Sequence, residues 1–421
     1  MAMDTKRLRS IIGGSAGNLV EWYDWYAYTA FSLYFASSFF PKGDPTAQLL
    51  STAAIFAVGF LMRPIGAWLM GIYGDRHGRK AGLAVSVALM AAGSLMIAAA
   101  PTYGQAGVIA PLWLLTARLL QGLSVGGEYG TSATYLSEMA TQGRRGFWSS
   151  FQYVTLIGGQ LLSLSVLLVL QATLSEAALS AWGWRIAFAI GALLAILVYV
   201  LRRGLAETAA FAQQDADRPK SSIGTLWRDH PRLFVIIAVV SAGGSLSFYA
   251  FTTYLQKFLV NTSGLSKPMA TEIMTVALVI FMCMQPVWGA ISDRVGRKPL
   301  LLLFSIGVAI ASVPVFSALA TVQSFGAALS LTLIPLTMLA AYTSIGAVYK
   351  AELFPPHIRT LGVALPYAIG NALFGGTAEY VALWFKQAGI ESAFYWYVSA
   401  VLVAASIAFL MLPETRHVDL E

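Results

Sequence analysis

The sequence has few charged residues, one cysteine and four histidines in its 421 residues. The lone Cys283 leaves no possibility of a disulfide framework, and the histidines are scattered, without the spacing of zinc ligands. The sequence also lacks the Walker A pattern of ATP-driven proteins and the nucleophile elbow of hydrolases. These absences predict that the protein is not an enzyme and has no catalytic residue, no metal and no cofactor.

Charged residues make up only 11% of the chain, whereas 57% of it is hydrophobic and the mean hydropathy is +0.68. Soluble domains carry about 25% charged residues, so this composition indicates a membrane protein. The net charge of +7 does not indicate nucleic-acid binding, because the basic residues lie in short loops between apolar runs. We therefore predict an all-α polytopic protein whose partner is the lipid bilayer and not nucleic acid.

Apolar runs long enough to span a bilayer, about 20 residues each, recur along the whole chain. The first six lie near residues 11–40, 48–72, 80–101, 108–137, 145–171 and 184–203. The second six lie near residues 233–260, 270–292, 299–320, 326–351, 359–385 and 392–412. We therefore predict an N-terminal six-helix bundle over residues 1–203, a C-terminal six-helix bundle over 232–421, and between them a polar linker over 204–231. A short surface helix is expected near its end.

Lysine and arginine are distributed unequally between the two sets of loops. With the N-terminus inside, most of them fall on one side, and the other side receives only Lys42, Arg185, Lys267 and Lys386. Cytoplasmic loops are enriched in Lys and Arg, so this asymmetry predicts the orientation. Because the number of spans is even, both termini are expected in the cytoplasm.

One stretch occurs twice, at roughly half-chain spacing. Residues 71–80 and 289–298 both follow the pattern G-x-x-x-D-R-x-G-R-K. A second pattern, Y-x-x-E followed by an arginine, occurs in residues 135–144 and again in 349–359. Self-similarity at this spacing within an apolar protein indicates a duplicated membrane bundle. The late glycine of each copy, such as Gly296, predicts a tight reversal between two helices.

The acidic residues of these repeats are expected to act at helix ends. A carboxylate is stabilised beside the positive N-terminus of another helix, so we predict that Asp75 and Asp293 each cap a helix start in the opposite half. Glutamates at neighbouring helix ends are expected to pair with arginines of the repeated loops. The predicted conformational gate consists of Asp75, Arg79, Glu138, Arg144, Asp293, Arg297, Glu352 and Arg359.

Carboxylates inside the predicted spans are costly and usually functional. In the first span, Glu21 and Asp24 lie one turn apart and well inside the membrane, at about 1.5 Å of rise per residue. Burial favours the protonated form of a carboxylate and a nearby cation favours the charged form, so such a group can exchange protons. The predicted proton-coupling residues are Glu21, Asp24 and Glu128.

Cations inside the spans predict an anionic substrate. Arginine stays charged, and its planar guanidinium binds a carboxylate through two bonds. Arg63 and Arg118 are expected either to hold such a substrate or to form structural ion pairs, and Lys257 either faces them across a cavity or extends to the outer interface. The predicted substrate-binding residues are Arg63, Arg118, Tyr28, Tyr254, Lys257, Gln285 and Asn371.

The repeated loop resembles the signature that the major facilitator superfamily carries between helices 2 and 3 and between helices 8 and 9. Other stretches resemble its metabolite:H⁺ symporter branch, namely residues 18–24, 60–66, 118–130, 244–249, 252–257 and 374–381. The resemblance covers nearly the whole chain. It implies twelve helices in two six-helix bundles, transport by alternating access and a bacterial inner membrane. It also associates Arg118 with proton coupling.

The resemblance and the buried charges together imply a secondary active transporter that takes up a small dicarboxylate with H⁺ as the coupling ion. The first candidate substrate is 2-oxoglutarate. The alternatives are citrate-like tricarboxylates, a neutral osmolyte or shikimate, and, in a different class, a nutrient sensor that binds without transport. The fifth span contains Gly158 and Gly159 without the proline-containing glycine motif of drug/H⁺ antiporters, which favours symport. We expect the protein to act as a monomer.

Overall fold

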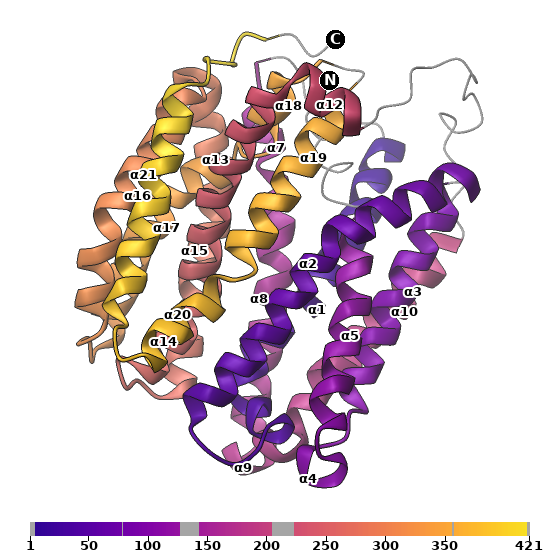
Figure 1. The fold of residues 1–421 in the computed structure, drawn as a ribbon, viewed down its shortest axis with the longest axis vertical. Helices are drawn as coiled ribbons and strands as arrows, with labels where there is room; N and C mark the ends of the chain where they lie inside the picture. The colour runs from indigo at the N-terminus through magenta and orange to yellow at the C-terminus, as the bar shows by residue number, and fades with distance from the viewer. Residues whose placement is uncertain (1–4, 78, 127–142, 204–222, 356–357, 419–421) are drawn as a thin grey trace.

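The computed structural model describes residues 5–77, 79–126, 143–203, 223–355 and 358–418, which form helices joined by short turns (Figure 1). The N-terminal part contains α1 (Thr5–Phe39), α2 (Pro45–His77), α3 (Arg79–Ala98), α4 (Tyr103–Ala106), α5 (Ile109–Val125), α7 (Arg145–Ser149), α8 (Phe151–Thr173), α9 (Glu176–Ala178), a π-helical turn η1 (Leu179–Gly183) and α10 (Trp184–Arg203).

The C-terminal part begins with the short helix α12 (Ile223–Asp229), close to the position expected from the sequence. It continues with α13 (Pro231–Tyr249), the π-helical turn η2 (Ala250–Tyr254), α14 (Leu255–Asn261), α15 (Lys267–Val295), α16 (Lys298–Leu319), α17 (Phe325–Thr343), α18 (Val348–Leu353), α19 (Arg359–Gly370), the π-helical turn η3 (Asn371–Gly375), α20 (Ala378–Gln387) and α21 (Ser392–Leu410).

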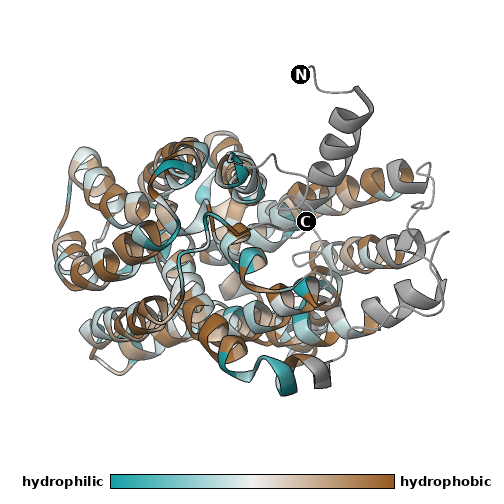
Figure 2. Ribbon diagram, turned by 90° about the horizontal axis from the view of Figure 1, so that it is seen from above, coloured by the Kyte–Doolittle hydropathy of each residue, from teal (hydrophilic) through white to brown (hydrophobic). Residues whose placement is uncertain are grey.

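Eight of the described helical runs are long and apolar enough to cross a membrane, and α5 and the second part of α3 are shorter apolar helices. The two remaining long runs, α1 and α19–η3–α20, carry buried acidic residues, Asp24 and Glu379, which lower their hydropathy. Apolar residues, brown in Figure 2, occur along nearly all the helices. The predicted all-α membrane fold is thereby confirmed.

The helices form two groups that lie side by side (Figure 1). The N-terminal group comprises α1 to α10, and the C-terminal group comprises α12 to α21. They meet where α15 packs against α7 and α8, and where α2 packs against α20 and η3. We call the end with α7, α12 and α18 the upper end, and the end with α4, α9 and α14 the lower end, as in Figure 1.

Polar contacts join the two groups at the lower end. The Lys267 ammonium lies 2.6 Å from a carboxylate oxygen of Glu176, and the Gln387 amide donates to Asp44 over 3.1 Å. The Gln171 amide also donates to the hydroxyl of Thr271. These contacts connect the two groups at the lower end.

Candidate functional site

Two buried arginines lie on the same tryptophan ring in the N-terminal group. The guanidinium carbon of Arg63 on α2 is 4.1 Å from the centroid of Trp25, and that of Arg118 on α5 is 3.9 Å from it. Arg63 also lies 4.0 Å from the centroid of Phe60, and Arg118 lies 4.4 Å from that of Tyr28. Such cation–π contacts hold a guanidinium without neutralising its charge.

Both arginines retain unused hydrogen-bond donors. Nε and Nη2 of Arg63 and of Arg118 are buried and have no hydrogen-bond acceptor, and neither residue forms an ion pair within the described part of the chain. Nη1 of Arg118 donates to the side-chain oxygen of Gln121 over 2.7 Å. A buried donor without an acceptor is costly, so this arrangement is suited to bind an anion that supplies acceptors.

Glycines bring the helices that carry these arginines together. A Cβ atom on Gly66 of α2 would collide with the backbone of Leu123 on α5, and one on Gly122 would collide with the carbonyl of Gly59. The backbones of α2 and α5 are therefore in direct contact beside the arginines. This close approach lets Arg63 and Arg118 both reach the ring of Trp25.

Asp24 on α1 lies in a hydrogen-bond network that leads to Arg118. It is fully buried and accepts hydrogen bonds from the hydroxyl of Ser94 on α3 and from the amide of Gln121, the latter over 3.3 Å. Its second oxygen has no hydrogen-bond partner among the described residues, and a Cβ atom on Gly191 of α10 would collide with it. Gln121 therefore connects the carboxylate of Asp24 with the guanidinium of Arg118.

Glu21, one turn before Asp24, is buried in a different polar group. The hydroxyl of Ser124 on α5 lies 3.5 Å from a carboxylate oxygen of Glu21, and Ser86 and Ser124 donate to each other's backbone carbonyls. The predicted proton-coupling pair is thus divided between two environments. The third member of that set, Glu128, lies outside the described residues.

The predicted cation of the C-terminal group is paired inside the protein. The Lys257 ammonium lies 2.8 Å from a carboxylate oxygen of Glu379 on α20, and both side chains are buried. Of the two alternatives that the sequence left open for Lys257, extension to the outer interface does not describe this buried position, and the other, that Lys257 faces Arg63 and Arg118 across a cavity, stays a prediction.

Three further predicted substrate residues use their polar groups within the protein. The hydroxyl of Tyr28 donates to the carbonyl of Thr52, and that of Tyr254 donates to Glu391 over 3.4 Å. The side-chain oxygen of Gln285 accepts from Thr343. Asn371, at the start of η3, differs from these, because its buried side-chain oxygen has no hydrogen-bond partner in the described part of the chain.

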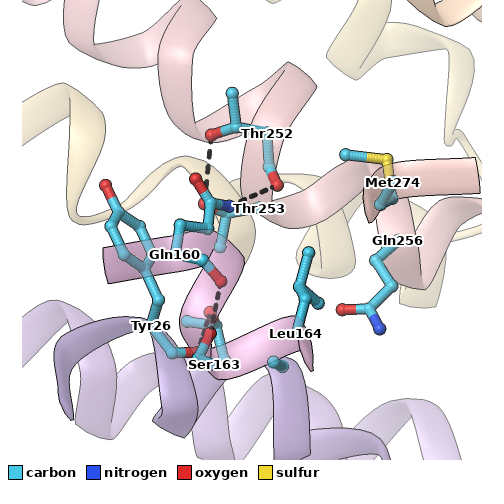
Figure 3. Close-up of a pocket in the computed structure, with 10 residues that line it drawn as sticks. Tyr26, Gln160, Ser163, Leu164, Thr252, Thr253, Gln256 and Met274 are labelled. Carbon is cyan, nitrogen blue, oxygen red and sulfur yellow. Dashed lines mark hydrogen bonds between the residues drawn. The ribbon is translucent and has the colours of Figure 1, made fainter. Parts of the chain in front are cut away.

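A small pocket lies between the two groups, at the level of Tyr26 (Figure 3). Gln160 from α8 crosses the interface and donates to the carbonyl of Thr252 in η2 over 2.8 Å. Tyr26 also stacks on Trp22, whose ring lies 5.2 Å from the guanidinium carbon of Arg63. The pocket is lined by Tyr26, Thr29, Ala30, Gln160, Ser163, Leu164, Thr252, Thr253, Gln256 and Met274. It is therefore lined by neutral polar and apolar side chains.

At the upper end, Asp293 caps a helix of the opposite group, as the sequence predicts. One carboxylate oxygen accepts from the backbone N–H of Gly146 over 2.8 Å, and the other accepts from that of Phe147 over 3.0 Å. Both N–H groups belong to the first turn of α7, for which Arg144 is the exposed residue at the helix start. The C-terminal end of α15 is thereby attached to the N-terminal group.

Arg297 of the predicted gate lies next to this cap. Arg297 pairs with Asp293 at 2.9 Å and with Glu352 at 3.3 Å, and Glu352 also accepts from Thr415. Arg359 donates to the carbonyl of Phe354. The tight reversal expected at the end of the repeated loop is present at Gly296, whose φ is +109°.

The segment after α21 is held on the same end by Glu414. Burial raises the pKa of the Glu414 carboxyl, but hydrogen bonds from the backbone N–H groups of Arg297, Arg416, Lys298 and Thr415 outweigh it and hold that pKa below its ordinary value. Glu414 therefore remains charged at the start of α16. This acidic cap was not anticipated from the sequence.

Part of the predicted gate lies outside what the structure describes. Glu138 lies outside the described residues, and the side chains of Asp75 and Arg79 are likewise outside the description, although their backbone belongs to α2 and α3. The gate role of all eight predicted residues stays a prediction.

Several polar residues at the centre were missed by the sequence analysis. Ser94, Gln121 and Gln160 are short or neutral side chains in apolar runs, and no repeat or charge distinguishes them there. Lys350 was also missed, although it lies within the repeated Y-x-x-E pattern; in the structure it is fully buried. An ionisable residue inside a predicted span was a signal that could have identified it.

Comparison with known proteins identifies relatives over the full length of this chain. A family model described as the Major Facilitator Superfamily matches residues 16–365 and 264–420. The Alpha-ketoglutarate permease of Escherichia coli (strain K12) is 54% identical over 97% of this chain and 94% of its own. A Citrate-proton symporter of Salmonella typhi is 34% identical, over 96% and 93% of the two chains.

A solved structure supports the same fold. The inward open conformation of the xylose transporter XylE from E. coli aligns with a TM-score of 0.78 over 98% of both chains, at 20% identity. At this identity the likeness shows the fold alone. Together with the family model and the relatives, it identifies the chain as a member of the major facilitator superfamily, a membrane transporter and not an enzyme.

Proposed function

We propose that this transporter takes up a small dicarboxylate together with H⁺, and that 2-oxoglutarate is its substrate. The observation that carries the proposal is the pair of buried guanidiniums on Trp25, each with two donors that have no acceptor. The printed name of the E. coli relative at 54% identity supports the same substrate, since alpha-ketoglutarate is 2-oxoglutarate.

In this proposal Asp24 carries the proton. Protonation of Asp24 removes a negative charge from the network that Gln121 connects to Arg118, so the two arginines attract an anion more strongly. Loss of the proton on the other side of the membrane has the opposite effect and weakens the hold on the substrate. Proton and dianion therefore bind cooperatively, which is the coupling that symport requires.

The shared cation in this scheme is Arg118 and not Arg63. The hydrogen bonds of Asp24 lead through Gln121 to Arg118. Arg63 has Nε and Nη2 available for the substrate, next to Tyr26 and the pocket between the groups.

The bacterial relatives support a place in the bacterial inner membrane. We orient the upper end toward the cytoplasm, because the loops on that side carry most of the Lys and Arg residues. Both termini are then cytoplasmic. The contacts of Asp293, Arg297 and Glu352 would form the cytoplasmic gate, and they must break each time the transporter opens inward. We propose that a monomer suffices for this cycle.

Uptake into proteoliposomes tests the function. Purified protein in liposomes with an alkaline interior, placed in acidic buffer, should accumulate radiolabelled 2-oxoglutarate, and a protonophore should abolish the accumulation. Liposomes without protein are the control. Binding of 2-oxoglutarate by the purified protein without any accumulation would contradict transport and favour a sensor.

A tricarboxylate is the second candidate, because citrate-proton symporters are relatives at 34% and 33% identity. The same liposomes distinguish it. If citrate is accumulated and displaces 2-oxoglutarate, the substrate assignment is wrong while the symport mechanism stands. Accumulation of glycine betaine would instead indicate a neutral osmolyte, as the name of the Proline/betaine transporter of E. coli implies for that relative at 31% identity.

A further inference from the structure

A chain of hydrogen bonds connects Arg118 with Asp24 in the N-terminal group. Nη1 of Arg118 donates to the side-chain oxygen of Gln121 over 2.7 Å, and the amide nitrogen of Gln121 donates to the hydroxyl oxygen of Ser94 over 2.9 Å. The Ser94 hydroxyl in turn donates to a carboxylate oxygen of Asp24. All four side chains are buried. Each hydrogen of the chain therefore points away from the guanidinium and toward the carboxylate.

The orientation of the Gln121 amide follows from the groups at the two ends of this chain. A guanidinium only donates hydrogen bonds and an ionised carboxylate only accepts them, so the amide oxygen must face Arg118 and the amide nitrogen must face Ser94 and Asp24. Gly93 of α3 leaves space for this side chain, because a Cβ atom there would collide with Cγ of Gln121. Rotation about the last side-chain bond exchanges the two ends of an amide with little change in shape.

Protonation of Asp24 reverses what its end of the chain requires. A protonated carboxyl group donates a hydrogen bond, and Ser94 and Gln121 are the side chains that hydrogen-bond to it in the described part of the chain. Ser94 then accepts from the carboxyl group and directs its own hydrogen at Gln121, which has to present its oxygen. The turned amide faces Arg118 with its N–H groups, and a guanidinium has no acceptor to offer them.

We propose that Gln121 is a positioning residue that turns over when Asp24 is protonated and thereby frees Nη1 of Arg118 for the substrate. The inference rests on the proposed H⁺-coupled uptake and names the residue that transmits the arrival of the proton. The proton adds to the carboxylate of Asp24, and no covalent bond of Gln121 changes. The freed Nη1 joins Nε and Nη2 of Arg118, which are buried without an acceptor, so the whole guanidinium becomes available to one anion.

The same step in reverse releases the substrate. When Asp24 loses its proton, the carboxylate again accepts from Ser94 and Gln121, and the amide oxygen turns back to Arg118 and competes with the anion for Nη1. A charge effect alone would act on Arg118 with any side chain at position 121, whereas this step requires a side chain with both a donor and an acceptor. The two explanations therefore differ in what a substitution of Gln121 does.

Other ionisable groups near Asp24 belong to separate contacts. Tyr23, which interacts electrostatically with Asp24, donates its hydroxyl to a backbone carbonyl of α10. From α3 and α10 the facing residues are Ser94 and Gly191, which do not titrate. The helices α4 and α8 and the turns η1 and η2, which also pack against α1, contain no acidic or basic residue. The charged residues that α1, α2 and α5 place around the chain are Glu21, which lies beside Ser124, Arg63 and Arg118.

The test measures how the affinity for 2-oxoglutarate depends on pH. Calorimetry on the purified full-length transporter gives the dissociation constant at an acidic and at an alkaline pH, for the wild type, Gln121→Met and Gln121→Leu. Both replacements approximate the volume of glutamine without its donor and acceptor, and the second guards against a packing defect of the first. Ser94→Ala interrupts the same chain at a smaller side chain. The matched control is Gln323→Met, which removes an amide that donates to the carbonyl of Ser263.

The wild type and Gln323→Met should bind 2-oxoglutarate about 5- to 150-fold more tightly at the acidic pH, the usual range of coupling between two sites. Gln121→Met and Gln121→Leu should lose most of this factor, and Ser94→Ala should lose part of it. In proteoliposomes the two Gln121 variants should exchange internal for external substrate but accumulate little of it under a pH gradient.

An unchanged pH factor in the Gln121 variants, even with weaker affinity at both pH values, would overturn the inference, because a structural role lowers affinity without altering its pH dependence. A full factor in Ser94→Ala would do the same, and this variant decides the question if the Gln121 variants do not fold. A wild type whose affinity is independent of pH also refutes the inference. These results leave the proposed substrate intact as long as the wild type accumulates 2-oxoglutarate, whereas a wild type that neither binds nor accumulates it refutes both proposals.

Discussion

Two buried cations of the C-terminal group and two of the N-terminal group are held in opposite ways. In the C-terminal group, Lys257 and Arg297 each lie within ion-pair distance of a carboxylate. In the N-terminal group, Arg63 and Arg118 lie on aromatic rings and keep donors without acceptors. A buried charge without a partner reduces stability, so its presence indicates a function that requires it. The comparison teaches that burial alone does not identify a ligand-binding cation, whereas the absence of a partner does.

The contrast predicts its largest effect at Asp24, the carboxylate that Gln121 connects to Arg118. Asp24→Asn should abolish accumulation of substrate driven by a pH gradient, because an asparagine cannot exchange the proton. Exchange of internal for external substrate should persist, since it needs no net proton movement. Both are measured in proteoliposomes, with Glu21→Gln as the comparison. Accumulation by Asp24→Asn together with its loss in Glu21→Gln would transfer the proton site to Glu21.

The paired cation of the C-terminal group should behave as a structural element. Lys257→Met leaves Glu379 buried without its partner, and the free energy of unfolding should fall by about 3–5 kcal/mol. Adding Glu379→Gln to Lys257→Met should recover most of this loss, and the double variant should bind substrate with wild-type affinity. Denaturant unfolding and calorimetry measure the two quantities. A double variant that is stable but does not bind substrate would place Lys257 in the binding site after all.

Arg63, which is stacked on Trp25 in the N-terminal group, should show the reverse pattern, with substrate binding affected and stability largely unchanged. Arg63→Ala should weaken substrate binding by about 2–5 kcal/mol, because it removes a desolvated partner of the anion. Its stability should change little, since no ion pair of the described residues is lost. The matched control is Arg185→Ala, an arginine that is also stacked on a tryptophan, Trp184 at 4.3 Å, but donates to backbone carbonyls. Unchanged affinity in the Arg63 variant would exclude the substrate contact.

The smallest effect is expected at the gate, where one group caps a helix of the other. Asp293→Asn weakens the attraction for the start of α7 by about 0.3–2 kcal/mol. The free energy of substrate binding should change by no more than this amount, about 0.3–2 kcal/mol, while the upper end opens more often. Labelling of an engineered cysteine near Gly146 measures this, in a Cys283→Ser background because the native thiol is exposed. Unaltered labelling, with Asp75→Asn equally silent, would remove the cap from the gating mechanism.

Much of the fold could be predicted because it depends on local composition. The lengths of apolar runs anticipate the spans, and the repeated loop anticipates both the cap at Asp293 and the reversal at Gly296. A loop pattern carries this information because its glycine and its aspartate have local roles. The glycine adopts a φ that other residues rarely adopt, and the aspartate carboxylate is attracted to the N-terminus of a helix.

The candidate site could be predicted only in part. Hydropathy shows that Arg63, Arg118, Asp24 and Lys257 are buried in a membrane protein, but not what each one touches. The π-helical turn η3, which begins at Asn371, also has no signal in the sequence. Such turns depend on packing between helices, which no sequence window contains.

The sequence by itself determined the class of protein, the two helix sets and the presence of charges within the membrane, because hydrophobic length and the cost of burying a charge are properties of each segment. Only the tertiary structure decided that Lys257 is neutralised by Glu379, that Arg63 and Arg118 share Trp25, and that Asp24 reaches Arg118 through Gln121. Partners distant in the chain decide whether a buried charge is compensated, and that distinction separates a structural cation from one that is left to bind a substrate.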